Sequence, residues 1–176
     1  MYSEWLKLLH TAVWFGCLLA AVVSDHRTRK IPNQLILTGV LLATVLAALG
    51  GVQAFWNAAA GGTAAFVAGF ILWKLRVFRA GDAKLLWMTM QFAGWESWTW
   101  HMSTILLVGG VFATVILLRQ GNFVQRIQRI AIYLYNMVVL GRYTPYEQLP
   151  EDKGRFPFAD AVFVGELVAC LILYRR

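Results

Sequence analysis

The stretch "TAVWFGCLLAAVVSDHRTRKIPNQLILTGVLLATVLAAL", residues 11 to 49, sets two apolar runs on either side of a short charged linker. A helix needs about 20 apolar residues to cross the hydrocarbon of a bilayer. Shorter runs can still span when the bilayer thins or when their ends reach the interface. The stretch therefore predicts two membrane helices that are joined on one side of the membrane.

The rest of the chain follows the same pattern. Of its 176 residues, 59% are hydrophobic and 14% are charged, which is outside the range of soluble domains. We therefore predict an all-α, polytopic membrane helical bundle that forms a single domain over residues 1 to 176. About six spans are expected, at residues 5–24, 34–50, 54–73, 84–95, 101–118 and 158–174.

Two parts of the chain need a separate interpretation. The first run predicts a retained span and not a signal peptide, because its basic start is weak and no small-residue cleavage pattern follows. Residues 120 to 157 hold no clean span. Up to about residue 141, apolar side chains recur at helical spacing beside arginines, which is typical of an amphipathic helix at the interface, and a polar loop rich in turn residues follows. Part of this helix, "IAIYLYNMVVLG", is apolar enough to enter the membrane.

The net charge of +7 does not indicate a nucleic-acid partner, because the basic residues are scattered between apolar runs and line no aromatic groove. They indicate orientation, since cytoplasmic loops carry the excess of Lys and Arg. Six spans place most of them on one side, which predicts a cytoplasmic face that receives Arg27, Arg29, Lys30, Lys74, Arg76, Arg79, Lys84, Arg119, Arg126, Arg129, Arg142, Lys153 and Arg155. Only Lys7, Arg175 and Arg176 fall on the other side.

Acidic residues are scarce, at 9 in the chain, yet Asp25 ends the first span and Asp82 precedes the fourth. Two crossings lie between them, so both aspartates are expected at the cytoplasmic face. Acids close to membrane depth are costly and tend to be functional. Each also has a bland interpretation: Asp82 as a helix N-cap, and Asp25 as a solvated partner of Arg27 or Arg29.

Two carboxylates held close together cannot both ionise easily, so they share a proton and divide the roles of general base and general acid. Aspartic proteolysis needs this pair and no metal. Cys17 and Cys170 lie inside apolar runs without a CxxC or Cys/His cluster, so neither a metal site nor a disulfide framework is predicted. We expect no cofactor.

Four flanking residues have physical roles of their own. Gly81 allows unusual backbone conformations and a close approach of substrate to Asp82. Pro32 suits the start of the next helix, and Asn33 can form hydrogen bonds near that turn. Lys84 could lower the pKa of a nearby carboxylate or contact lipid phosphate.

With "SDHRTRKIPN" and "AGDAKLL", the sequence resembles the type IV prepilin peptidases, membrane aspartic proteases that remove prepilin leaders at the cytoplasmic face. The resemblance implies that Asp25 and Asp82 are catalytic and that Pro32, Asn33, Gly81 and Lys84 support them. "KGRFPFADAVFVGELV" is similar to the family's Pro-Phe-Gly stretch. Two positions depart from the pattern, since Arg79 and Ala159 replace glycines.

The chain lacks the cysteine-bearing cytoplasmic domain of the bifunctional members, so it resembles the short, peptidase-only branch of tight-adherence (Flp-type) pilus systems. This implies an inner-membrane enzyme without N-methyltransferase activity, whose partners are the lipid bilayer and a prepilin or pseudopilin helix within the membrane. A non-catalytic scaffold of a pilus or secretion assembly is the main alternative. A proton-relay transporter is less favoured, because the acids lie at the membrane edge.

Overall fold

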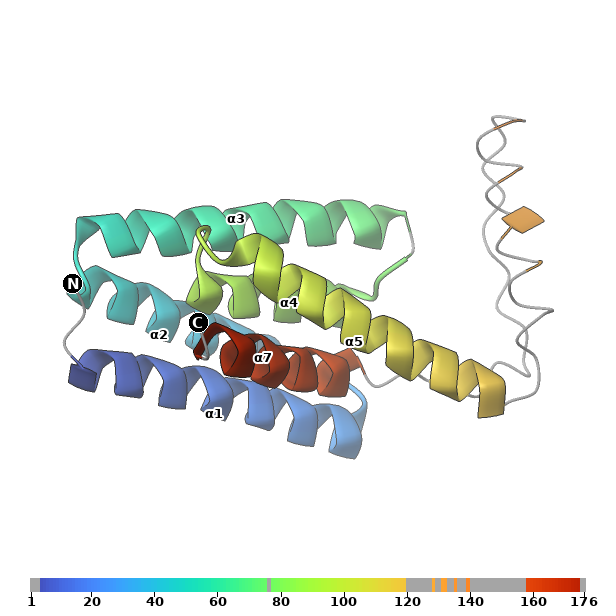
Figure 1. The fold of residues 1–176 in the computed structure, drawn as a ribbon, viewed down its shortest axis with the longest axis horizontal. Coiled ribbons are helices and arrows are strands. Elements are labelled where there is room, and N and C mark those ends of the chain that lie inside the picture. Colours follow the sequence, from blue (N-terminus) through green and yellow to red (C-terminus); the bar gives the residue numbers. More distant parts are fainter. Residues whose placement is uncertain are drawn as a thin grey trace. The chain divides into compact units, whose positions relative to one another are not determined.

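A computed structural model describes residues 4–75, 77–119 and 158–174, together with residues 128, 131, 132, 135 and 139. All regular structure in these residues is helical, so the all-α prediction is confirmed (Figure 1). The helices are α1 (Glu4–Thr28), α2 (Asn33–Leu49), α3 (Val52–Lys74), α4 (Ala80–Ala93), α5 (Trp98–Arg119) and α7 (Phe158–Tyr174).

The chain divides into two compact units, residues 1–109 with 157–176 and residues 110–156. The first unit holds α1 to α4, α7 and the part of α5 up to Gly109. In the second unit, the structure describes the end of α5 and the few residues named above. The predicted interfacial helix over residues 120 to 141 lies almost wholly outside the described residues and stays a prediction.

The predicted hairpin of two apolar helices is formed by α1 and α2, which pack against each other. Their linker turns at Arg29, which has a left-handed φ of 54°, a conformation that bars further helix. The hydroxyls of Ser24 and Thr28 donate to the carbonyl of Lys30 at 2.9 and 3.1 Å. Pro32 follows in extended conformation as the N-cap of α2, so the chain around Asp25 is held by local bonds.

Helix α4 lies at the centre of the first unit, in contact with α1, α2, α3 and α7. Its buried side chains are Leu85, Leu86, Met88, Thr89, Met90, Gln91 and Phe92. Every residue from Leu85 to Phe92 except Trp87 is buried, so most of this helix of 14 residues is covered by other helices. Its neighbours separate it from the surroundings, so it needs neither length nor a continuous apolar face.

Glycines allow α3 to approach α4 closely. A Cβ atom built on Gly61 would lie 2.6 Å from the backbone carbon of Gly94, and one on Gly69 would lie 3.1 Å from the Cβ of Ala83. A Cβ on Gly62 would overlap the side chain of Gln91. These glycines therefore serve packing, and α3 is an unbroken helix with no sign of the interruption that a transport path would need.

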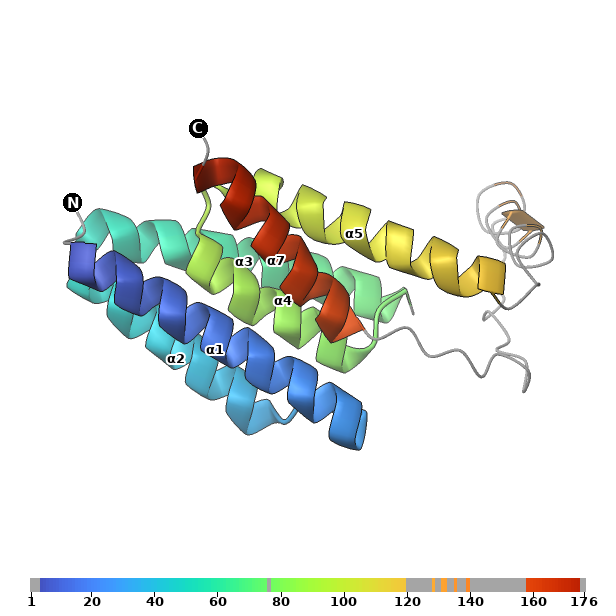
Figure 2. The ribbon, with the colours of Figure 1, turned by 60° about the horizontal axis from the view of Figure 1, so that its bottom comes forward.

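Among the described residues, three helices are long and apolar enough to cross a membrane: α1, α3 and α5 over Trp98–Ile116. Helix α2 is apolar but shorter, with 17 residues. Helix α7 has the same length as α2, and α4 has 14 residues. A membrane protein is thus indicated, while the crossing of all six helices stays a prediction. The C-terminal end of α1 and the first residues of α2, α4 and α7 lie at one end of the first unit (Figures 1 and 2).

Candidate active site

Asp25 and Asp82 reach the same end of the helical bundle from different helices. Asp25 lies in the last turn of α1, and Asp82 lies in the first turn of α4 (Figure 2). Both residues are partly buried. The negative charge of Asp25 is close enough to Asp82 to add to the rise of its pKa, whose main cause is burial.

Asp82 occupies the third helical position of α4, with Arg79 as the N-cap. The backbone N–H of Arg79 donates to Oδ2 of Asp82 at 3.2 Å. The interpretation of Asp82 as the N-cap is therefore wrong, because Asp82 lies three residues after the N-cap. Its carboxylate reaches back to the backbone of the cap residue, as an acid at this position commonly does.

Burial raises the pKa of Asp82 above its ordinary value, because desolvation disfavours the charged form. The bond from the Arg79 backbone and the Arg79 charge act in the opposite direction, and the Asp25 charge adds to the rise. The direction that prevails is upward. Asp82 therefore keeps its proton to a higher pH than an ordinary aspartate does.

Lys84 and Asn33 join the two sequence motifs. The Nζ atom of Lys84 donates a hydrogen bond of 2.8 Å to Oδ1 of Asn33. Asn33 does not cap α2 with its side chain, and the charge that lowers the pKa of Asp82 comes from Arg79. The start of α2 is therefore tied to the first turns of α4, beside Asp82.

The structure agrees with the local conformation predicted for Pro32 but not with the one predicted for Gly81. Pro32 lies directly before α2, as predicted, with φ −62° and ψ 138°. Gly81 is an ordinary helical residue of α4, so the expectation that it needs a conformation barred to other residues is wrong. A Cβ at Gly81 would meet nothing within 4 Å, which leaves open space beside Asp82.

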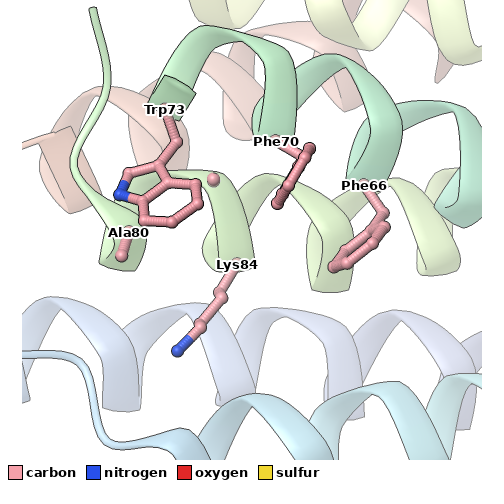
Figure 3. A pocket seen from close by; sticks show the side chains of 6 residues that line it. Phe66, Phe70, Trp73, Ala80 and Lys84 are labelled. Atoms are coloured by element: carbon pink, nitrogen blue, oxygen red, sulfur yellow. The ribbon is translucent and has the colours of Figure 1, made fainter. Parts of the chain in front are cut away.

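A pocket of about 260 Å³ lies between α3 and α4, lined by residues that flank Asp82 in the sequence but not by Asp82 itself. Figure 3 shows the rings of Phe66, Phe70 and Trp73 on one side of it and the Lys84 side chain on the other, with the amine pointing away from the rings. Ala80 and Ala83 complete the lining. Its walls are almost wholly apolar, so it suits an apolar group.

Sequence reasoning missed a contact next to Asp25. The Nε2 atom of His26 lies 2.9 Å from both carboxylate oxygens of Asp160, in the first turn of α7. No ion pair joins Asp25 to Arg27 or Arg29 in the part of the chain that the structure describes. The position of His26 directly after Asp25 was a signal, but its partner is remote in sequence.

A second missed pair lies inside the bundle. Nδ1 of His101 on α5 and Oε2 of Glu166 on α7 are 2.5 Å apart, and both side chains are buried. An acid within an apolar helix normally has a function or a specific partner. The run "FADAVFVGELVACLILY" shows this acid clearly, whereas nothing in the sequence identifies His101 as its partner.

No cluster of metal-ligating side chains is found among the described residues, and Cys17 and Cys170 are unpaired thiols in partly buried positions. The model of the type IV leader peptidase family matches residues 12–118. Comparison with curated proteins and with solved structures gives no match. The matched range includes both aspartates and the residues that flank them, and it ends before α7.

Proposed function

The chain belongs to the type IV leader peptidase family, and we propose that it is a membrane aspartic endopeptidase of prepilin-like substrates. The observation that carries this proposal is the arrival of Asp25 and Asp82 at one end of the bundle, from the last turn of α1 and the first turn of α4. There burial raises the pKa of Asp82, and the charge of Asp25 adds to the rise. Two interacting carboxylates, one as general base and one as general acid, are what aspartic proteolysis requires.

The raised pKa of Asp82 supports a division of roles in this pair. Asp25, as carboxylate, takes a proton from water, and the resulting hydroxide attacks the scissile carbonyl carbon. Asp82, as carboxylic acid, donates a proton toward the carbonyl oxygen. When the tetrahedral gem-diol collapses, the C–N bond breaks, Asp25 gives its proton to the leaving amine and Asp82 regains a proton from a hydroxyl of the gem-diol. The products are one new carboxyl and one new amino terminus.

The substrate that fits this arrangement has a leader outside the bilayer and an apolar helix within it. The aspartates lie at helix ends, so the cut would occur near the membrane surface. The apolar pocket between α3 and α4, which Ala83 lines directly after Asp82 in the sequence, supports the binding of an apolar part of the substrate near the start of α4. Because 13 of the 16 Lys and Arg are expected on this side, we place the site at the cytoplasmic face of the inner membrane.

We assign the chain to the short, Flp-type branch without N-methyltransferase activity. Only residues 29 to 32 separate α1 from α2, which leaves no space there for an added cytoplasmic domain. The assignment predicts that the new amino terminus of the product is unmethylated. Mass analysis of the mature substrate measures this directly.

Leader removal in co-expression tests the proposed function. The protein is expressed with small proteins that carry a basic leader before an apolar helix, and the mass of each product is recorded. We expect wild type to remove the leader, and Asp25→Asn and Asp82→Asn to leave it in place at equal expression. Glu4→Gln, at the other end of α1, is the control and should cleave normally. If both Asn variants assemble the partner complex as wild type does and no chain cleaves, the scaffold alternative is correct.

A further inference from the structure

Helix α7 lies outside the range that matches the family, yet it supplies two of the chain's nine acids, Asp160 and Glu166. It packs against α1 and α4, the helices that carry Asp25 and Asp82. The two acids are six residues apart, so they lie about 9 Å apart along the helix axis at 1.5 Å per residue. Each has its own partner on another helix.

At the rim of the site, the first turn of α7 contacts both segments that hold the aspartates. Asp160 accepts from Nε2 of His26 at 2.9 Å to each oxygen, and His26 directly follows Asp25 on α1. The ring of Phe158 lies 5.2 Å from the ring of Phe78, which directly precedes the N-cap of α4. One turn of α7 thus touches the end of α1 and the entrance to α4.

Deeper in the bundle, a second pair fixes the position of α7 along its axis. Glu166 has no exposed surface and lies 2.5 Å from His101. A buried charged or polar group of this kind is very unfavourable without its partner. A Cβ on the neighbouring Gly165 would lie 2.8 Å from the Cα of Ile105, so α5 and α7 also touch through their backbones. Sliding or rotation of α7 would break this pair.

From these contacts we infer that α7 is the positioning element of the aspartate pair, with Asp160 holding Asp25 in place through His26. The Glu166–His101 pair fixes the position of α7 along its axis, so that Asp160 lies next to His26. This inference rests on the proposed function. Asp160 is a positioning residue in this scheme, because it acts on Asp25 through another side chain and takes no proton from water or substrate.

Asp160→Asn tests the inference, because the amide keeps the size of the side chain and removes its charge. A misplacement of about 1 Å in a catalytic group can reduce the rate on the order of a hundredfold. We expect kcat for leader cleavage to fall between about tenfold and a hundredfold with KM unchanged, at equal amounts of folded protein. Glu4→Gln removes the exposed Lys7–Glu4 ion pair at the other end of α1 and should change neither constant.

Exchange of the two partners separates positioning from a general loss of structure. The double variant His26→Asp with Asp160→His restores the contact in the reverse direction, and we expect it to recover most of the kcat that either single substitution removes. A kcat of Asp160→Asn equal to wild type, or no recovery on exchange, would overturn the inference. Complete inactivity of Asp160→Asn would also overturn it, because Asp160 would then belong to the catalytic group itself.

A second measurement examines the deeper pair. Glu166→Gln keeps a hydrogen-bonding group beside His101, so we expect folded protein with a smaller loss of kcat than Asp160→Asn causes. Crosslinking of cysteines placed at positions 26 and 160, in a chain with Cys17→Ala and Cys170→Ala, reports the docking of α7 without cleavage. Reduced crosslinking in the Glu166→Leu background is expected, and unchanged crosslinking would contradict the role of Glu166.

The outcomes of the inference and of the proposed function can be told apart. If Asp25→Asn and Asp82→Asn are inactive while Asp160→Asn has the wild-type kcat, only the inference about α7 fails. If Asp25→Asn or Asp82→Asn still cleaves at the wild-type rate, the aspartic mechanism itself fails. The crosslinking result stands in either case, since it depends on the docking of α7 alone.

Discussion

Nζ of Lys84 donates a hydrogen bond of 2.8 Å to Oδ1 of Asn33, and this bond connects two motifs that are remote in the sequence. Asn33 begins α2, directly after the linker that follows Asp25, and Lys84 lies half a turn beyond Asp82 on α4. The bond therefore ties the start of α2, next to the linker that follows α1, to the first turns of α4 beside Asp82. A hydrogen bond with a charged donor is stronger than a neutral one, although solvent weakens it at an exposed site.

The Lys84–Asn33 bond predicts coupling between the two residues. Asn33→Ala and Lys84→Ala should each lower the thermal midpoint in detergent, and the double variant should lose less than the sum of both. We expect a coupling free energy of about 0.5 to 1 kcal/mol, the lower part of the range for residues in contact. Strict additivity of the two losses would show that the bond contributes nothing.

Arg79 predicts a shift in the pH dependence of cleavage. Its charge lowers the pKa of Asp82, so Arg79→Gly should raise that pKa further and move the alkaline decline of kcat/KM to higher pH. Arg79→Lys keeps the charge and should leave the decline in place. Added salt should reduce the difference between wild type and Arg79→Gly, because exposed charges are screened. A decline that moves to lower pH in Arg79→Gly contradicts this account.

The raised pKa of Asp82 predicts that a residue required for activity lowers the stability of the folded protein. Its pKa is raised in the folded protein, so between its ordinary and its raised pKa the folded state binds more protons than the unfolded state. Stability therefore falls as the pH rises through this window. Asp82→Asn removes that loss and can still accept from the Arg79 N–H.

The thermal midpoint of Asp82→Asn should accordingly exceed that of wild type at pH 7, by about 2 to 4 °C for each kcal/mol regained. The difference should vanish at a pH below the ordinary pKa of an aspartate. Glu4→Gln serves as the control with an exposed acid. A midpoint for Asp82→Asn below that of wild type at pH 7 would mean that the charged carboxylate stabilises the fold.

Gly61 predicts a strong cost for one added methyl group. A Cβ there would lie 2.6 to 2.9 Å from backbone atoms of Gly94, Met90 and Trp95, which cannot move aside without shifting α4. We expect Gly61→Ala to lower the free energy of unfolding by about 1 to 3 kcal/mol, the usual cost of overpacking. Gly16→Ala is the matched control, since a Cβ at Gly16 meets nothing within 4 Å. Equal midpoints for the two variants would contradict the close packing of α3 on α4.

The general fold could be predicted from the sequence because apolar runs and turn residues are local signals. Pro32 marked the start of α2, and the number of runs between Asp25 and Asp82 placed both at one end of the bundle. The central position of α4 could not be predicted, because burial by neighbouring helices leaves no periodic pattern. The conformation predicted for Gly81 was wrong for a related reason. What distinguishes Gly81 is the open space next to it, which depends on the packing of other helices, and not an unusual backbone φ.

The partners of His26, Asn33 and Glu166 were also beyond the reach of the sequence. Each contact joins residues from different helices, and the side chains face one another only once the helices have packed. Glu166 is visible in the sequence as an acid in an apolar run, whereas the predicted site rests on the acids at helix ends. A buried acid in a membrane helix is itself a signal, and its partner is expected to be a basic or polar residue at matching depth.

The rate of leader cleavage by Asp25→Asn, by Asp82→Asn and by the double variant tests the central claim most directly. Residues that act as one catalytic unit give losses that do not add. We predict that each single variant is already as slow as the double variant, while all three remain folded with α7 docked. Cleavage by either single variant at the wild-type rate, or a double loss equal to the product of two partial losses, would contradict the shared role of the two aspartates.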